Sequence, residues 1–162
     1  MATNLQVGDA APAFRAVAAG AGYGTGREVS LSDFHGKPLV LYFYPKDDTP
    51  GCTVQACGLR DAWTDIRDRA ALFGVSVDPP KSHSKFIEKF QLPFPLLSDA
   101  DKKMVNDYGV WVEKNFMGKK HMGVERSTFV IDGSGRICAI FRKVKPAEHV
   151  DLVKNALPGS GR

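Results

Sequence analysis

Cysteine pairs, long hydrophobic runs and blocks of like charge are all scarce in this chain of 162 residues. No run is long enough to span a bilayer, so we expect no membrane-embedded segment. The net charge is only +4 and no block of one sign occurs, so we expect no nucleic-acid partner. Residues 1–7 lack the basic start and apolar core of a secretory signal. The three cysteines cannot all pair within the chain, which argues against a secreted disulfide framework and favours a cytoplasmic setting.

Length and composition predict one domain over residues 1–162. The chain is 43% hydrophobic and 25% charged, which is ordinary for a globular protein. A chain of this length can bury roughly 70% of the surface that it exposes when unfolded. No internal repeat or linker divides it, so a single hydrophobic core is expected.

The most informative stretch is residues 39–63. It opens with LVLYFY, an apolar and aromatic run that ends at Pro45 and predicts a strand buried on both faces. A polar loop follows at 46–48. Thr49 is a favoured helix N-cap and Pro50 suits the first helical position, so a helix is predicted to begin there.

Cys52 therefore falls in the first turn of a helix, directly after a central strand. Ligand sites in α/β sheets lie at the carboxyl ends of strands. Free N–H groups and the helix dipole at this end favour an anion. Because the thiolate is the reactive form of cysteine, the position indicates a nucleophile. The alternative is a buried structural cysteine, since free cysteine is among the most buried residue types.

The periodicity of apolar residues predicts further elements around this stretch, which together indicate an α/β fold with a central mixed sheet. Residues 16–26 are small and glycine-rich, which favours a flexible loop or loose hairpin. The predicted helix face after Cys52 continues through Trp63. The other predicted elements are strands at 71–77, 127–131 and 137–141 and helices at 82–90 and 147–157.

Cys57 lies five residues after Cys52 and poses a geometric problem. On an ideal helix the two Cα atoms are roughly 8.6 Å apart, whereas a disulfide needs less than about 7 Å. Either Cys57 is structural, or the helix must unwind before the two sulfurs can bond. Gly51 and Gly58 flank the pair, and a glycine inside a helix costs about 1 kcal/mol relative to alanine, which favours unwinding.

The same stretch resembles a known family. Pro45, Thr49 and Cys52 match the P-x-x-x-T-x-x-C motif of peroxiredoxins, and Cys57 matches the bacterioferritin-comigratory protein (PrxQ) branch. Three further blocks resemble that family in the right order, so the resemblance covers nearly the whole chain. They lie at 8–14, 92–99 and 125–132.

The resemblance implies a thioredoxin-like fold and a thiol peroxidase that reduces hydrogen peroxide and organic hydroperoxides without a metal, haem or flavin. Cys52 would attack the peroxide and become a sulfenic acid. Cys57 would then form an intrahelical disulfide with it, and a thioredoxin-type dithiol would reduce that bond. Because resolution within one helix needs no second subunit, we expect a monomer.

The resemblance also implies roles for Thr49, Pro45 and Arg126. Thr49 would hydrogen-bond the peroxide, Pro45 would shield the thiolate from water, and Arg126 would stabilise the thiolate and the charge that develops as the O–O bond breaks. The plain alternatives are a helix cap, a strand terminator and a surface salt bridge. Gln55 departs from the glutamate that many relatives carry; its amide can accept a hydrogen bond from Arg126 but lacks the charge.

Two other functions fit parts of the sequence. A thiol–disulfide oxidoreductase could use the same fold, but its C-x-x-C spacing is absent. A non-catalytic redox sensor or holdase could use the same disulfide. A zinc or iron–sulfur site is disfavoured, because paired C-x-x-C motifs and closely spaced histidines are missing.

The remaining cysteine, histidines and lysines are predicted to have no chemical role. Cys138 is expected to be a packed bystander on a strand. The basic cluster at 119–121 is expected to be a solvated loop. The four histidines are expected at the surface; they are His35, His83, His121 and His149.

Overall fold

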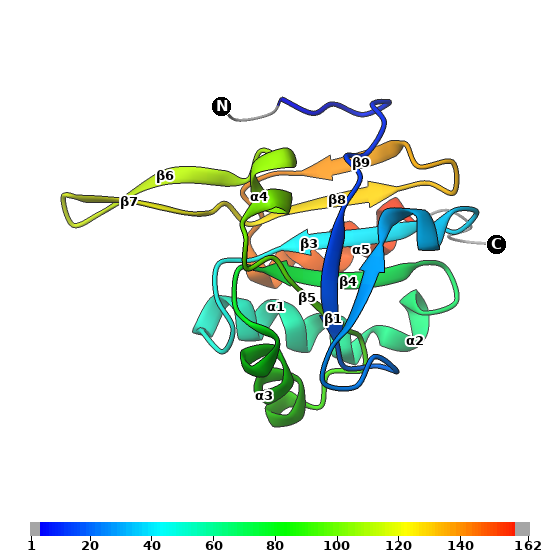
Figure 1. Ribbon diagram of the computed structural model, residues 1–162, viewed down its shortest axis with the longest axis horizontal. Helices are drawn as coiled ribbons and strands as arrows, with labels where there is room; N and C mark the ends of the chain where they lie inside the picture. Colours follow the sequence, from blue (N-terminus) through cyan, green and yellow to red (C-terminus); the bar gives the residue numbers. More distant parts are fainter. Residues whose placement is uncertain (1–3, 158–162) are drawn as a thin grey trace.

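The computed structural model describes residues 4–157, so the predicted absence of a leader at 1–7 falls partly outside the described residues. A seven-stranded mixed sheet, ordered β2-β1-β5-β4-β3-β8-β9, forms the centre of the fold (Figure 1). None of the helices in the described range has the length and apolar character to cross a membrane. The sheet strands are β1 (Arg15–Ala19), β2 (Arg27–Ser30), β3 (Leu39–Phe43), β4 (Ala71–Ser76), β5 (Leu96–Ser98), β8 (Ser127–Ile131) and β9 (Ile137–Phe141).

Helices cover the sheet on its two faces, and a separate two-stranded hairpin projects from the body (Figure 1). The helices are α1 (Pro50–Asp61), α2 (Trp63–Ile66), α3 (Pro80–Phe90), α4 (Lys103–Asp107) and α5 (His149–Ala156), with 3₁₀ turns η1 (Leu31–Phe34) and η2 (Pro146–Glu148). The hairpin strands are β6 (Trp111–Phe116) and β7 (Lys119–Val124).

Strand β3 lies inside the sheet, as its apolar sequence predicts. All five of its residues are buried. It pairs in parallel with β4, to which the chain returns by way of α1 and α2. On its other side it pairs antiparallel with β8. In the β8 pairing Phe43 lies opposite Ser127, so the residue before Ser127 comes to the carboxyl end of β3, where α1 begins.

The two faces of β3 contribute to two hydrophobic clusters. Val40 and Tyr42 pack in one cluster with Leu59 of α1 and Val153 of α5. Leu39, Leu41 and Phe43 pack in the other, which includes residues of α4. Burying one large apolar side chain contributes roughly 1.5–3 kcal/mol, so both clusters hold β3 in place. The cluster with Val40 and Tyr42 also holds the start of α1.

Several predicted boundaries differ from the structure. Helix α1 ends at Asp61, and Trp63 begins the separate helix α2. For residues 16–26 the hairpin alternative is confirmed and the loop alternative is wrong, because β1 pairs antiparallel with β2 on one side and with β5 on the other. The basic cluster 119–121 lies in strand β7 and not in a loop, although its side chains are exposed. The prediction of a solvated face was right and that of a loop was wrong, because β6 supplies the backbone partners.

The prediction of surface histidines is wrong for two of the four. His35 and His121 are exposed, but His83 and His149 have no exposed surface. His149 lies at the start of α5, where its Nε2 is 2.7 Å from Thr128 Oγ1 and its Nδ1 has no hydrogen-bond partner. Burial, with a smaller effect of the nearby Arg126 charge, lowers the pKa of His149 from 6.5 to about 3. His149 is therefore neutral near neutral pH.

This burial makes an acid-stability prediction. Because the pKa of His149 is lower in the folded state, the unfolded chain binds more protons between about pH 6.5 and 3. The free energy of unfolding is therefore unaffected by His149 above this pH range. As the pH falls through the range, it decreases by up to about 1.4 kcal/mol per pH unit. In urea titrations, His149→Gln should show a shallower loss of unfolding free energy on acidification. Equal pH dependence in both proteins would contradict this.

Candidate active site

The first turn of α1 buries the Cys52 side chain, which is 2% exposed. As predicted, Thr49 occupies the N-cap position and Pro50 the first helical position. Thr49 does not, however, make the side-chain hydrogen bond to the helix backbone that is usual for an N-cap threonine. The Thr49 hydroxyl accepts none from the helix backbone and instead donates one to the Lys46 carbonyl at 2.8 Å. Its oxygen lone pairs therefore stay available to another donor.

Arg126 is the charged side chain that contacts the thiol. Its Nη1 lies 3.4 Å from Cys52 Sγ and donates to Gln55 Oε1 at 2.5 Å. Cys52 and Gln55 are three residues apart on one face of α1, so one guanidinium bridges them. The Gln55 amide accepts the hydrogen bond, as its chemistry allows, while its buried Nε2 has no protein partner. Arg126 forms no ion pair with a carboxylate in the part of the chain that the structure describes.

Gly51 makes room for this guanidinium. A Cβ built on Gly51 would lie 3.0 Å from Arg126 Nη2 and 3.3 Å from Pro146 Cγ in η2. Such distances are tighter than ordinary side-chain contacts, so an alanine here would press on Arg126. The sequence indicates Gly51 only as a weak point of the helix. Its position beside Arg126 depends on residues 75 or more positions away, which spacing alone does not bring together.

The other predicted site residues lie in the loop before α1 and within α1 itself. Pro45 is half-buried where the chain leaves β3. Cys57 is half-buried within intact α1, and both thiols are free. The separation of roughly 8.6 Å for helical residues five apart therefore applies here. Cys138 is exposed on β9, so the prediction that it is packed is wrong.

A second cation, missed by the sequence analysis, comes from the hairpin. Lys114 on β6 is half-buried and packs over Gly123 of β7. Burial, followed by the Arg126 charge, lowers the pKa of Lys114, while the nearby Cys52 opposes that shift. Lys114 is therefore a second candidate cation for the site, beside Arg126. No sequence signal distinguished Lys114 from the neighbouring surface lysines.

Tyr42 of β3 packs in the same hydrophobic cluster as Cys52. Burial raises the pKa of Tyr42 well above its usual value, and the nearby Cys52 charge adds to the effect. The phenol is therefore neutral, and its buried hydroxyl has no protein partner. Among residues 4–157, no three histidine, cysteine or acidic side chains gather as metal ligands would. The site offers one thiol, two cations and hydrogen-bonding groups.

Comparison with known proteins gives a consistent family. The AhpC/TSA family model matches residues 7–140. The putative peroxiredoxin bcp of Coxiella burnetii is 47% identical over 155 residues, covering 95% of this chain and 99% of the relative. Peroxiredoxin Bcp of Escherichia coli K12 is 44% identical over 154 residues, covering 94% of this chain and 96% of the relative.

Solved structures agree with both the fold and the family. The Xanthomonas campestris bacterioferritin comigratory protein, described for its alkyl peroxide reduction activity, has a TM-score of 0.78. It is 38% identical and the match covers 86% of this chain and 87% of that one. The thioredoxin-like fold with a central mixed sheet is therefore confirmed. The chain belongs to the AhpC/TSA family and, within it, to the Bcp (PrxQ) peroxiredoxins, thiol peroxidases that act on peroxides.

Proposed function

We propose that the chain, as one domain, reduces hydrogen peroxide and alkyl hydroperoxides at Cys52. The observation that carries the proposal is the Arg126 guanidinium 3.4 Å from Cys52 Sγ, with the thiol in the first turn of α1. The thiolate attacks the terminal peroxide oxygen, an S–O bond forms and the O–O bond breaks. The leaving oxygen takes a proton and departs as water or an alcohol, and Cys52 becomes a sulfenic acid.

The surrounding groups suit this step. Arg126 and Lys114 oppose the negative charge on sulfur and on the leaving oxygen. The Thr49 hydroxyl donates its hydrogen bond to the Lys46 carbonyl, so its oxygen can accept a hydrogen bond from a peroxide O–H group. Pro45, half-buried beside the loop, limits the access of water to the thiolate.

In the second step Cys57 attacks the Cys52 sulfenic acid and water leaves, giving a disulfide. The intact helix keeps the two Cα atoms roughly 8.6 Å apart, beyond the reach of about 7 Å that a disulfide allows. The first two turns of α1 therefore unwind before this bond forms. A thioredoxin-type dithiol then reduces the disulfide by exchange. We infer a monomer that works in the cytoplasm, because both cysteines lie in one helix and the chemistry needs a reducing setting.

The cysteine roles give the first test of this proposal. Cys52→Ser should abolish peroxide consumption, because a serine hydroxyl is far less acidic than the thiol. Cys57→Ser should consume one equivalent of peroxide and then stop as a sulfenic acid, seen by mass spectrometry. Cys138→Ser is the matched control and should turn over normally with thioredoxin. Steady-state turnover by Cys52→Ser would overturn the assignment, and a single turnover by the unmodified protein would favour a redox sensor.

Replacing the arginine tests its role at the thiol. Arg126→Lys keeps the positive charge but loses the planar guanidinium, whose Nη1 lies within hydrogen-bond distance of both Cys52 and Gln55. We expect the second-order rate constant for Cys52 oxidation to fall by about tenfold to a thousandfold, by analogy with losing one oriented donor at a developing charge. Arg142→Lys, on an exposed arginine, is the control. An unchanged rate constant in Arg126→Lys would assign Arg126 a structural role only.

The unwinding step is tested at Gly58. A Cβ added there would lie 3.8 Å from Val150 Cβ, which is ordinary contact, so a methyl group fits. Gly58→Ala should favour the wound helix by up to about 1 kcal/mol, slowing disulfide formation by up to about fivefold. Peroxide attack should change less, so sulfenic acid should persist and overoxidise more readily.

Stopped-flow measurement of the two steps separates these effects. Ser84→Ala, which raises helix propensity in α3 away from both cysteines, is the matched control and should leave both rates unchanged. If Gly58→Ala forms the disulfide as fast as the unmodified protein, unwinding at this position does not limit the reaction.

A further inference from the structure

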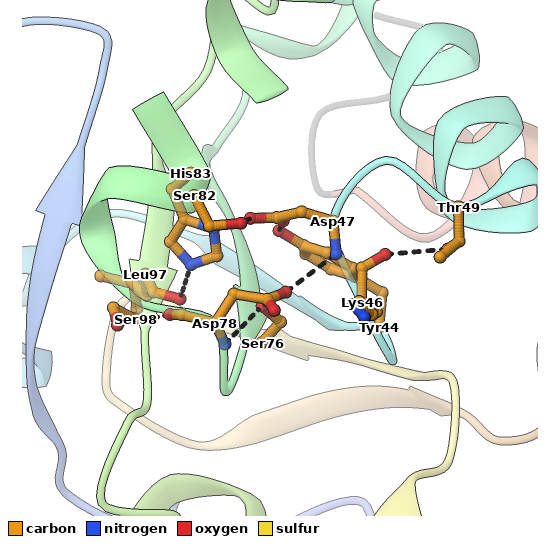
Figure 2. A network of polar contacts seen from close by, with 10 residues as sticks. All are labelled: Tyr44, Lys46, Asp47, Thr49, Ser76, Asp78, Ser82, His83, Leu97 and Ser98. Atoms are coloured by element: carbon orange, nitrogen blue, oxygen red, sulfur yellow. Dashed lines mark hydrogen bonds and ion pairs between the residues drawn. The ribbon is translucent and has the colours of Figure 1, made fainter. Parts of the chain in front are cut away.

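A buried polar network lies behind the loop that joins β3 to α1 (Figure 2). The Asp47 side chain is only 4% exposed. Its Oδ1 accepts a hydrogen bond from the Tyr44 hydroxyl, and its Oδ2 accepts one from Ser82 Oγ at 2.8 Å. The same Oδ2 lies 2.7 Å from His83 Nδ1, on a ring with no exposed surface. The acidic group is thus held by Tyr44, the residue after β3, and by two residues of α3.

The partners of His83 define where its protons lie. Its Nε2 is 2.8 Å from the Leu97 carbonyl oxygen, which can only accept, so Nε2 carries a proton. Its Nδ1 faces the Asp47 carboxylate, whose oxygens already accept from Tyr44 and Ser82. A second proton must therefore lie between Nδ1 and Oδ2. The two side chains therefore form a buried hydrogen-bonded pair.

Asp47 is held through its backbone as well as through its side chain. The Asp47 backbone N–H donates to Asp78 Oδ2 at 2.8 Å, and Asp78 is itself held by Ser76 Oγ at 2.8 Å. The Lys46 carbonyl belongs to the same planar peptide group and points the opposite way. It accepts the Thr49 hydroxyl proton at 2.8 Å (Figure 2). Fixing Asp47 therefore fixes the direction of the Lys46 carbonyl and, through it, the Thr49 hydroxyl.

We propose that Asp47 and His83 are positioning residues for the peroxide site, acting through the Lys46–Asp47 peptide on Thr49. This rests on the proposed function, in which the Thr49 oxygen accepts the peroxide O–H. Neither residue touches the reacting atoms. The pair anchors the loop to α3 and, through Leu97, to β5, so the Thr49 hydroxyl is held in place before peroxide arrives.

Two substitutions at His83 separate its two contacts. The amide nitrogen of asparagine lies one bond from Cγ, as Nδ1 does, so His83→Asn can still donate to Asp47. The amide nitrogen of glutamine lies two bonds from Cγ, as Nε2 does, so His83→Gln keeps the bond to Leu97 and loses the one to Asp47. Oxidation of Cys52 by peroxide should slow by about tenfold in His83→Gln and by less than about threefold in His83→Asn, since small misplacements of a reacting group are costly.

A control and a second background make the test specific. Lys89→Ala removes an exposed ion pair to Asp48 in the same loop and should leave the rate unchanged. Thr49→Val removes the hydroxyl on which the pair is proposed to act. In that background His83→Gln should slow oxidation by less than about twofold, because residues that act through one another are not additive. Asp47→Asn, which leaves the His83 bond to Leu97 in place, repeats the test if His83→Gln does not fold.

The outcomes are distinct. If the unmodified protein fails to react with peroxide at Cys52, the proposed function is wrong. If it reacts and His83→Gln reacts equally fast, only the positioning role is wrong. If His83→Gln loses the same factor with and without the Thr49 hydroxyl, or if His83→Asn is as slow as His83→Gln, the pair only supports the fold.

Discussion

The site depends on one guanidinium that bridges two residues of a single helical turn. Arg126 contacts the Cys52 sulfur and the Gln55 amide oxygen, which lie together only while α1 is wound. Three elements meet there, because Arg126 precedes β8 and Pro146 of η2 borders the same gap at Gly51. Winding of the helix and stabilisation of the thiolate are therefore parts of the same arrangement.

The second half of the proposed cycle makes the opposite demand. Cys57 reaches the Cys52 sulfur only when the turns between them open. The packing of α1 becomes tighter after Gly58, which suits such opening. Gly58 has no side chain and leaves room for a methyl group beside Val150, while Leu59 is fully buried and anchors the helix beyond it. Opening that stops before Leu59 leaves the hydrophobic cluster between α1 and the sheet largely intact.

Much of this could be predicted from the sequence, because the key signals are local. The β3 strand, the start of α1 and the spacing of Cys52 and Cys57 lie within one short stretch. The contact of Arg126 with Gln55 followed from the family motif and from the acceptor chemistry of an amide. The rest depends on residues far apart in the chain. His83 can be buried because its Nδ1 lies 2.7 Å from Oδ2 of Asp47, which is 36 residues earlier in the chain. No periodicity in the sequence indicates that pairing.

Other differences have similar physical causes. Cys138 lies on an edge strand at an irregularity in the pairing of β8 with β9. Val130 lies opposite Ala139 and Ile131 opposite Ile137, so Cys138 has no residue paired opposite it and is exposed. The β6–β7 hairpin is mostly exposed, so it lacks the apolar alternation that predicts a strand, yet it brings Lys114 to the site. These features arise from tertiary packing, whereas the reactive turn is encoded by its own residues.

Hydrogen exchange in α1 tests most directly the claim that peroxide attack uses the wound helix and disulfide formation the unwound one. The amides of residues 54–59 would be followed in the reduced protein and in protein whose Cys52–Cys57 disulfide is verified by mass spectrometry. The account predicts protection of these amides in the reduced form and its loss in the disulfide form, while β3 stays protected in both. Equal protection of residues 54–59 in the two forms would contradict it.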